Sequence, residues 1–381
     1  MNTILGELGK SQKFIEIVNK IENEKSPIAI SGLNDVGMVN LDVAIHEFTK
    51  RPICILTYNE IQAKKIYDDI KYFTDNVVIF PKKEVVTYDY IAESKENLYE
   101  RIEALNKIKS KKTLIVVTTI EAVMQKLPEK NTVYQNELKF KTGNSYKLDD
   151  IKRKLVDLGY VRCDLIEGIG QFSVRGDIVD ISINEKTGIR LEFWGDEIDS
   201  IREFNIETQR SIKNKNESTI YPSNEYILED SVDFICEKIR KKYKEYKNQN
   251  IIEEDIEQIK EGNYISKIDK YFDCFYSRQE TVLDYLSSKY VIFIDEVGKV
   301  EKRSENIKQD RENLQRGLIE KDKQVPEAIT NELDFEKVLE ELNNKQLVYI
   351  EKQDNEPKIK GEKYRLNYKD VNYYKLSLIH I

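Results

Sequence analysis

The 381-residue sequence has few of the residues that usually build metal centres and hydrolytic active sites. It contains only two histidines, His46 and His380, which argues against a histidine-based metal site or a catalytic triad within one chain. Its four cysteines are spread widely, with no pair at the spacing of metal ligands or of a redox couple: Cys54, Cys163, Cys236 and Cys274. We expect ordinary reduced thiols, some of them buried. Most hydrolase chemistry is thereby excluded.

The sequence also lacks long hydrophobic runs. The longest, TLIVV at 113–117 and YVIFI at 290–294, are far shorter than the roughly 20 residues that cross a bilayer. The N-terminal stretch MNTILGELGKSQKF has no apolar signal core. We therefore expect no membrane partner and a cytoplasmic location. A net charge of −8 argues against a general nucleic-acid coat, although a local basic patch stays open.

The length suggests two or three domains. From Pro27 to about Leu127, short apolar runs alternate with polar helical stretches such as the one from Glu60 to Phe73. The apolar runs are PIAIS, ICILTY, NVVIF and TLIVVTT. Short apolar strands separated by helices predict an α/β layer, with a parallel sheet covered on both faces.

Between about Lys139 and Asn205 the strands follow one another closely, and the Gly-containing turn NEKTG between two β-patterned runs predicts a hairpin. We interpret this part as a small β-rich α+β domain, inserted into the α/β layer. After a helical stretch from Asp230 to Ser266, whose charges form a solvated face, the apolar strands YVIFI and QLVYI resume the layer, separated by a charged helix to about Asn331. The first and third segments are therefore predicted to share one sheet.

The predicted domain boundaries are residues 1–135, 136–212 and 213–375. The last six residues, LSLIHI, break off the preceding pattern. We interpret residues 376–381 as a non-native tail and the chain as a fragment of a longer protein, which takes His380 out of any functional argument.

The stretch ISGLNDVGMV at 30–39 has the outline of a phosphate-binding loop without its reactive residues. Gly32 and Gly37 keep the required spacing, but Met38 replaces the lysine and Val39 replaces the hydroxyl residue. The charge-neutralising and magnesium-binding parts are both missing. Asp295-Glu296, after the strand YVIFI, has the form of the partner acidic motif. We interpret the loop as a structural strand–turn–helix, with weak residual nucleotide binding as the alternative.

The strand from Gly188 to Trp194 combines an apolar face with a chemically distinct one. Period-two alternation places Ile189, Leu191 and Phe193 on one face and Arg190, Glu192 and Trp194 on the other. The same alternation in QFSVRGD groups Ser173 with Arg175. Exposed arginine and tryptophan are typical of binding hot spots. The structural alternative is a Trp194 covered by a loop and arginines paired with Glu192 or Asp180; both interpretations stay open.

These segments carry a resemblance. GYVRCDLIEGIGQFSVRGDIVDI and IRLEFWGDEIDSIREFNIETQRS resemble the segment shared by the nucleotide-excision-repair protein UvrB and the transcription-repair coupling factor family (Mfd). FPKKEVVTYDYIAESKENLYERIEAL and FYSRQETVLDYLSSKYVIFIDEVGKV fit the coupling factors, so the likeness covers most of residues 1–375. UvrB keeps an intact Gly-Lys-Thr loop and a long aromatic hairpin, for which Val85–Ala104 is too short. The coupling-factor family is the better match.

The resemblance implies a degenerate helicase-type domain, split by an inserted domain that binds UvrA through two arginines and an aromatic residue. These fall on Arg175, Arg190 and Trp194, where relatives often have Phe at the third position. Complete family proteins continue into an RNA polymerase-binding domain and a translocase on double-stranded DNA, whose motor domains use ATP and Mg²⁺. None of that machinery appears before Ile381, so we expect no cofactor and no ATPase activity here.

Two alternatives follow from the same resemblance. One is a UvrB-type excinuclease or helicase fragment, with residual ATP binding at Gly32–Val39 and a metal on Asp295 and Glu296. The other is a regulatory module that masks the motor through its own surface.

Overall fold

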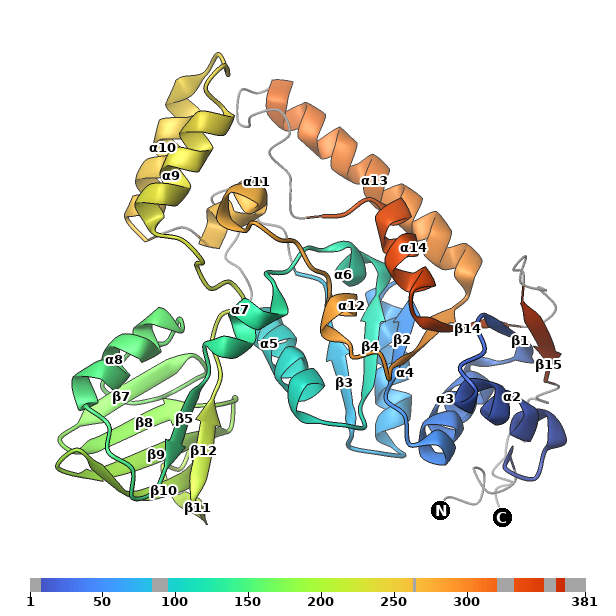
Figure 1. Cartoon of the computed structure of the whole chain (residues 1–381), viewed down its shortest axis with the longest axis horizontal. Helices are drawn as coiled ribbons and strands as arrows, with labels where there is room; N and C mark the ends of the chain where they lie inside the picture. The colour runs from blue at the N-terminus through green and yellow to red at the C-terminus, as the bar shows by residue number, and fades with distance from the viewer. Residues whose placement is uncertain (1–7, 84–94, 263–264, 321–331, 353–360, 367–381) are drawn as a thin grey trace, which may run out of the picture.

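A computed structural model describes residues 8–83, 95–262, 265–320, 332–352 and 361–366. The tail at 376–381 with His380, the EVVTYDY part of the FPKKEVVTYDY motif and the predicted helix end at Asn331 lie outside these ranges. Figure 1 shows a central sheet with flanking helices, a small β-rich domain beside it, and a helical hairpin that extends away from both.

The central sheet is parallel and has seven strands in the order β15-β1-β14-β13-β2-β4-β3. Its strands are β1 (Ile28–Leu33), β2 (Ile53–Thr57), β3 (Val77–Phe80), β4 (Ile115–Thr119), β13 (Val291–Asp295), β14 (Gln346–Lys352) and β15 (Glu362–Arg365). Four strands precede the insert and three follow it. The prediction that the first and third segments share one sheet is confirmed, as is the mixed α/β class with a separate β-rich part.

Helices cover both faces of this sheet. They are α2 (Gln12–Glu22), α3 (Asp35–Thr49), α4 (Glu60–Lys71), α5 (Lys95–Ser110), α6 (Ile120–Met124), α7 (Lys130–Gln135), α12 (Val282–Tyr285), α13 (Val297–Glu320) and α14 (Phe335–Asn343). Alternation along β2 sends Ile53 and Ile55 into one core with α2–α4, and Cys54 and Leu56 into a second core on the opposite face. A strand buried on both faces reads as one continuous apolar run, as ICIL does.

The inserted domain is joined to the layer by a two-stranded ribbon, β5 (Leu138–Lys141) paired with β12 (Glu217–Ile220). Its main sheet has the order β11-β10-β9-β8-β7-β6 and is covered by α8 (Leu148–Asp157). The strands are β6 (Val161–Arg162), β7 (Gln171–Arg175), β8 (Ile178–Ser182), β9 (Thr187–Trp194), β10 (Glu197–Asn205) and β11 (Ser211–Lys215). Because β11 and β12 lie in these sheets, we draw the end of the insert at Ile220, where the sequence suggested residue 212.

Hairpin turns set the register of this sheet. The hairpin predicted at NEKTG is present between β8 and β9, and the Asn184 side chain accepts the backbone N–H of Thr187 at 2.8 Å. Each of the two longer β-patterned runs is itself divided by a Gly-Asp turn, one at Gly176 and one at Gly195. Both glycines have positive φ, 60° and 64°, as two-residue hairpin loops require. The turns were missed because the apolar alternation continues across them.

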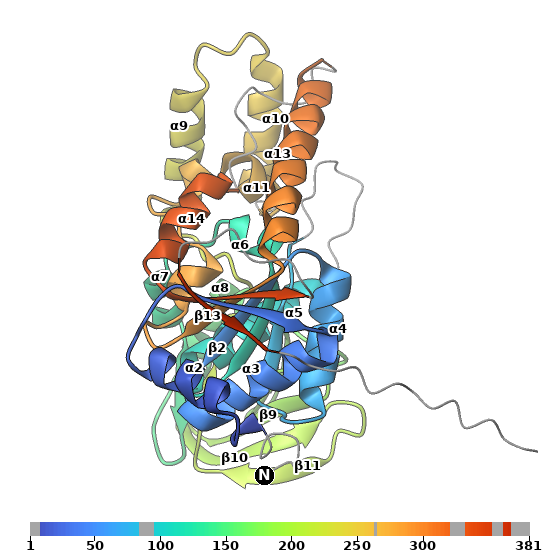
Figure 2. The same ribbon diagram turned by 90° about the vertical axis from the view of Figure 1, so that its right-hand side faces the viewer.

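The helical part consists of α9 (Val232–Lys242), α10 (Gln249–Lys260) and α11 (Ile265–Phe275). Figures 1 and 2 show α9 and α10 as a hairpin standing away from the central sheet. Apolar residues such as Ile235 and Ile256 form its core, while its lysines and glutamates face solvent.

All four cysteines are free thiols, as predicted, and burial raises the pKa of Cys54 to about 12. Among the described helices, none is long and apolar enough to cross a membrane. Within the described ranges, no group of three or more His, Cys, Asp or Glu side chains is placed to hold a metal ion.

Candidate protein-interaction site

Strand β9 presents the alternation predicted from the sequence. Ile189, Leu191 and Phe193 are buried in the core of the inserted domain. On the opposite face, Trp194 is 85% exposed at the end of the strand. No loop covers the ring, so that part of the structural alternative is wrong.

Asp180 on β8 holds both arginines. Its carboxylate accepts hydrogen bonds from Nε and Nη2 of Arg190, at 2.7 and 2.9 Å, and from Nη2 of Arg175 at 2.9 Å. The Asp180 side chain is only 2% exposed, whereas Arg190 is 16% and Arg175 49% exposed. The hydrogen bonds to Asp180 raise the pKa of Arg190. The predicted pairing with Asp180 is therefore present, and it leaves the outer edges of both guanidinium groups available.

The Glu192 carboxylate is engaged elsewhere. It pairs with Arg202 on β10 and accepts a hydrogen bond from the Ser200 hydroxyl at 2.7 Å. Two arginines thus share the single negative charge of Asp180. One guanidinium charge of this pair is therefore left without a carboxylate of its own.

Arg190 is also fixed from its other side by Phe204. The guanidinium carbon lies 4.7 Å from the centre of the Phe204 ring, a cation–π contact. Gly188 makes room for that ring, because a Cβ there would lie 2.5 Å from it. Phe204 could not be predicted from local patterns, since only the pairing of β9 with β10 brings Phe204 opposite Gly188.

The two Gly-Asp turns lie at the same end of the sheet. The backbone N–H of Phe193 donates to the carbonyl oxygen of Asp177 at 2.9 Å, which joins one turn to the strand that enters the other. Arg175 precedes the first turn and Trp194 precedes the second. We call Arg175, Arg190 and Trp194 the Arg–Trp surface.

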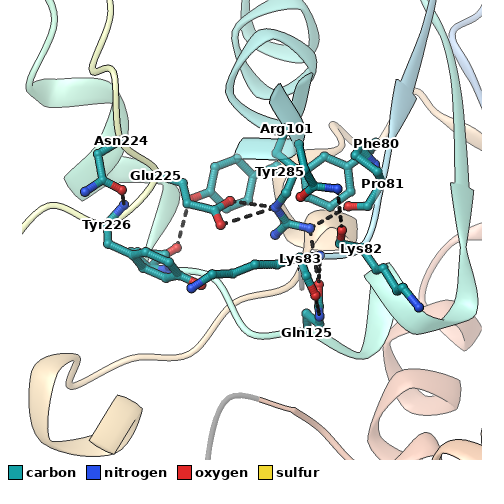
Figure 3. A network of polar contacts seen from close by, with 12 residues as sticks. Phe80, Pro81, Lys82, Lys83, Arg101, Gln125, Asn224, Glu225, Tyr226 and Tyr285 are labelled. Carbon is teal, nitrogen blue, oxygen red and sulfur yellow. Dashed lines mark hydrogen bonds and ion pairs between the residues drawn. The ribbon is translucent and has the colours of Figure 1, made fainter. Parts of the chain in front are cut away.

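A buried polar cluster fixes the chain where the insert returns to the α/β layer (Figure 3). Arg101 on α5 is completely buried, and its Nε lies 2.9 and 3.2 Å from the two carboxylate oxygens of Glu225, which follows β12. Its Nη1 donates to the carbonyl oxygen of Pro81 at 2.6 Å and to the Gln125 side chain at 3.2 Å. The guanidinium also stacks 4.3 Å from the centre of the Phe80 ring.

The same cluster reaches the helical part. Lys83 pairs with Asp269 on α11 at 3.1 Å and lies 4.3 Å from the centre of the Tyr226 ring, and both charged side chains are buried. The Gln125 amide donates to the Lys83 carbonyl at 2.7 Å. One buried network therefore ties together the layer, the segment that follows the insert, and the helices. Sequence reasoning did not assign Arg101 a role, although it lies in the FPKKEVVTYDY…YERIEAL motif that carried the resemblance.

The degenerate loop adopts the predicted strand–turn–helix. Gly32 is still part of β1, with φ of 83°, and Gly37 lies inside α3. The Asn34 side chain caps α3 by accepting the Gly37 N–H at 2.7 Å. Met38 and Val39 are buried in the core beside α2–α4.

Neighbouring groups occupy the space in front of this loop. A Cβ on Gly32 would lie 2.3 Å from the carbonyl oxygen of Leu366, next to β15. Lys352 bridges Asp35, at 2.6 Å, and Glu296, at 3.0 Å. Burial alone would lower the pKa of Lys352, but hydrogen bonds to these two carboxylates raise it. The lysine therefore neutralises protein carboxylates at the place where a phosphate-binding loop holds its ligand.

Asp295 is hydrogen-bonded to neutral side chains, whereas Glu296 pairs with Lys352. The buried Asp295 carboxylate accepts from the Thr57 hydroxyl at 2.9 Å and from the Gln62 amide at 3.3 Å. Burial raises the pKa of Asp295 to about 6. Asp42 on α3 is buried at the same small cavity, and burial together with the charge of Asp295 raises the pKa of Asp42 well above its usual value. The Oδ1 atoms of Asp42 and Asp295 have no hydrogen-bond partner among the described residues.

This geometry predicts a dependence of stability on pH. A carboxyl whose pKa is raised in the folded state stabilises the fold below about pH 4 and loses that contribution as the pH rises through about 6. Asp295→Asn removes the titration and keeps an acceptor oxygen. Relative to the wild type, it should gain about 2 to 3 kcal/mol in free energy of unfolding between pH 4 and 7, at 1.4 kcal/mol per pKa unit.

Urea unfolding at several pH values measures this difference. The control is Asp149→Asn, which changes an exposed carboxyl on α8 and should run parallel to the wild type. Parallel curves for Asp295→Asn would show that Asp295 is ionised throughout.

The loop geometry predicts that Mg-ATP does not stabilise the chain. A ligand present well above its dissociation constant must raise the unfolding midpoint, by about 2.7 kcal/mol in stability at a hundredfold excess. Calorimetric unfolding with and without millimolar Mg-ATP should give one midpoint. An upward shift that disappears in Gly32→Ala would restore the residual-nucleotide alternative.

Comparison with known proteins finds a family model for the inserted domain. Residues 138–226, from β5 to just beyond β12, match the family model described as the UvrB interaction domain. The matched residues span the whole inserted domain. All three residues of the Arg–Trp surface lie on the main sheet of this domain.

The curated relatives extend the likeness beyond the UvrB interaction domain. The transcription-repair-coupling factor of Bacillus subtilis (strain 168) is 26% identical over 364 residues, which cover 92% of this chain and 31% of that protein. That of Staphylococcus epidermidis (strain RP62A) is 26% identical over 330 residues, covering 83% and 28%. That of Staphylococcus aureus (strain MRSA252) is 25% identical over 331 residues, covering 84% and 28%. The predicted resemblance to the coupling factors is confirmed, and the chain spans about a third of their length.

Proposed function

We propose that this chain is the UvrA-recruiting part of a transcription-repair coupling factor and acts in transcription-coupled nucleotide excision repair. The observation that carries the proposal is the Arg–Trp surface itself: a fully presented tryptophan beside two arginines, on the sheet matched by the UvrB interaction domain. Exposed tryptophan and arginine are the side chains most enriched at binding hot spots.

The chemistry of the surface supports a partner that presents carboxylate or carbonyl oxygens. Each guanidinium has five N–H donors, and Asp180 takes two from Arg190 and one from Arg175. The remaining donors can bind carboxylates or carbonyl oxygens of UvrA by charge-assisted hydrogen bonds. In this proposal, Trp194 fills an apolar pocket of UvrA that lies between these oxygen atoms. Because Asp180 fixes both arginines before binding, little side-chain entropy is lost when the complex forms.

In this proposal the chain has no ATPase activity and needs no cofactor. The support is the loop at Gly32–Val39, whose lysine and hydroxyl positions carry buried Met38 and Val39. ATP-driven translocation on double-stranded DNA and contact with RNA polymerase belong to other parts of a complete coupling factor. The proposed location of the chain is the cytoplasm.

Competition with UvrB tests the recruitment role. Labelled chain is bound to UvrA, and unlabelled UvrB is then added while fluorescence anisotropy is followed. If both proteins use a UvrB interaction domain at one site on UvrA, UvrB should displace the chain completely. In a matched titration, labelled Trp194→Ala chain is used in place of the wild type. Because this variant should bind UvrA poorly, its anisotropy should change little at any stage. Binding that UvrB leaves intact would place the contact elsewhere, and no binding by the folded chain would favour the regulatory alternative.

A further inference from the structure

The amino-terminal edge of the central sheet carries a row of basic residues. Strands β14, β13, β2 and β4 are neighbours in that order and run parallel, so the residues that precede them lie along one edge. Each is preceded within four residues by lysine or arginine: Lys345 before β14, Lys289 before β13, Arg51 before β2, and Lys111 with Lys112 before β4. We call these five residues the basic edge.

The basic edge lines an open groove with a strong local excess of positive charge. Eight lysine and arginine side chains line it, against three acidic ones, Glu22, Glu24 and Asp284. Two of the eight, Lys50 and Lys109, are paired with Glu47 and Glu137 outside the groove, which leaves six. The whole chain has the opposite balance, with 61 basic and 69 acidic residues. The positive charge is therefore a property of this edge and is hidden in the net charge.

Two of these cations are hydrogen-bonded to neutral groups, which supply no opposite charge. Arg51 donates to the carbonyl oxygens of Ile21 and Lys289, both at 3.0 Å. Lys111 donates to the side-chain oxygen of Asn76 at 2.9 Å. These hydrogen bonds orient the side chains toward the edge without pairing them with a carboxylate.

Lys112 and Lys289 are exposed, and no carboxylate among the described residues lies within ion-pair distance of either. Neighbouring strands are about 4.8 Å apart, so the row from β14 to β4 spans roughly 14 Å. That length covers about four 3.4 Å steps along the axis of a duplex, enough for about four phosphate contacts.

We propose that the basic edge binds the sugar–phosphate backbone of a nucleic acid duplex. A protein partner is the less suitable occupant, because protein interfaces need aromatic or aliphatic anchors. None of the large exposed hydrophobic side chains of the described residues lines this groove. The contact is independent of sequence, since it reaches phosphates alone. It is also separate from the Arg–Trp surface and does not depend on UvrA binding.

Fluorescence anisotropy with a labelled DNA duplex of about 30 base pairs tests the proposal on the full chain. Four phosphate contacts predict a slope of log affinity against log salt near −3.6, so binding should weaken about 100-fold between roughly 50 and 200 mM salt. Lys112→Glu with Lys289→Glu should reduce affinity at least tenfold at the lower salt and make the slope shallower by about 2. Lys112→Gln with Lys289→Gln removes the same contacts if the first variant fails to fold.

The matched control is Lys241→Glu with Lys244→Glu, which changes two exposed lysines at the end of α9 by the same charge. The control should keep the wild-type slope. An equal loss in the control would mean that overall charge alone governs binding, and an absence of wild-type binding at low salt would remove the site; either result overturns the proposal. If polyglutamate binds the basic edge and the duplex does not, the edge belongs to an acidic protein and the proposal is also wrong. Arg175→Ala with Trp194→Ala should bind the duplex as the wild type does.

Discussion

Replacing Arg101 with methionine is expected to lower the free energy of unfolding by about 3 to 5 kcal/mol, because it leaves the Glu225 carboxylate buried without its cation. Both side chains are fully buried, so no water can replace the lost interaction. The same change also removes the hydrogen bonds to Pro81 and Gln125. Urea unfolding followed by far-UV circular dichroism measures the loss.

The matched control is Arg153→Met, which breaks an exposed pair with Asp150 on α8. Exposed pairs contribute about 0 to 1 kcal/mol, so this variant should unfold close to the wild type. The double variant Arg101→Met with Glu225→Leu should recover a large part of the loss, since no charge is then left buried. Equal effects of Arg101→Met and Arg153→Met would show that the cluster in Figure 3 does not hold the insert to the layer.

Replacing Trp194 with alanine is expected to weaken binding to UvrA about 30- to 100-fold, which corresponds to 2 to 3 kcal/mol. Stability should change by less than about 0.5 kcal/mol, because the ring is 85% exposed and packs against no core. Ile212→Ala, at another exposed apolar position of the same domain, is the control and should bind as the wild type does. A Trp194→Ala variant that binds normally would remove the ring from the interface.

The two arginines are expected to separate binding from stability. Arg175→Ala should weaken binding with little effect on the fold, since Asp180 keeps Arg190. Arg190→Ala should do both, because it removes two of the three hydrogen bonds to the buried Asp180 carboxylate and the contact with Phe204. Thermal midpoints measured beside the binding titrations distinguish the two cases.

Local patterns in the sequence predicted the parts of the site that lie on one strand. Alternation along β9 placed Arg190 and Trp194 opposite the core, and NEKTG located the hairpin before them. The same alternation concealed the turns at Gly176 and Gly195. Apolar periodicity survives a two-residue hairpin, so only the Gly-Asp pairs themselves signalled those turns.

Contacts between distant segments could not be predicted in this way. Arg101 and Glu225 are 124 residues apart, and no local pattern in α5 marks Arg101 as the partner of Glu225. The residues of the basic edge are even more widely separated along the sequence. Lys289 and Lys112 become near neighbours only because the order of the parallel strands, which the sequence does not state, brings β13 within two strands of β4.

Isothermal titration of UvrA with the wild-type chain and with the double variant Arg175→Ala, Trp194→Ala would decide whether the Arg–Trp surface binds UvrA. Both changes are at exposed side chains, so the variant should fold as the wild type does. The account predicts a saturable complex for the wild type and loss of measurable heat for the variant. Equal binding by the two proteins would contradict the assignment of the Arg–Trp surface, and a folded wild-type chain that does not bind UvrA would contradict the proposed function.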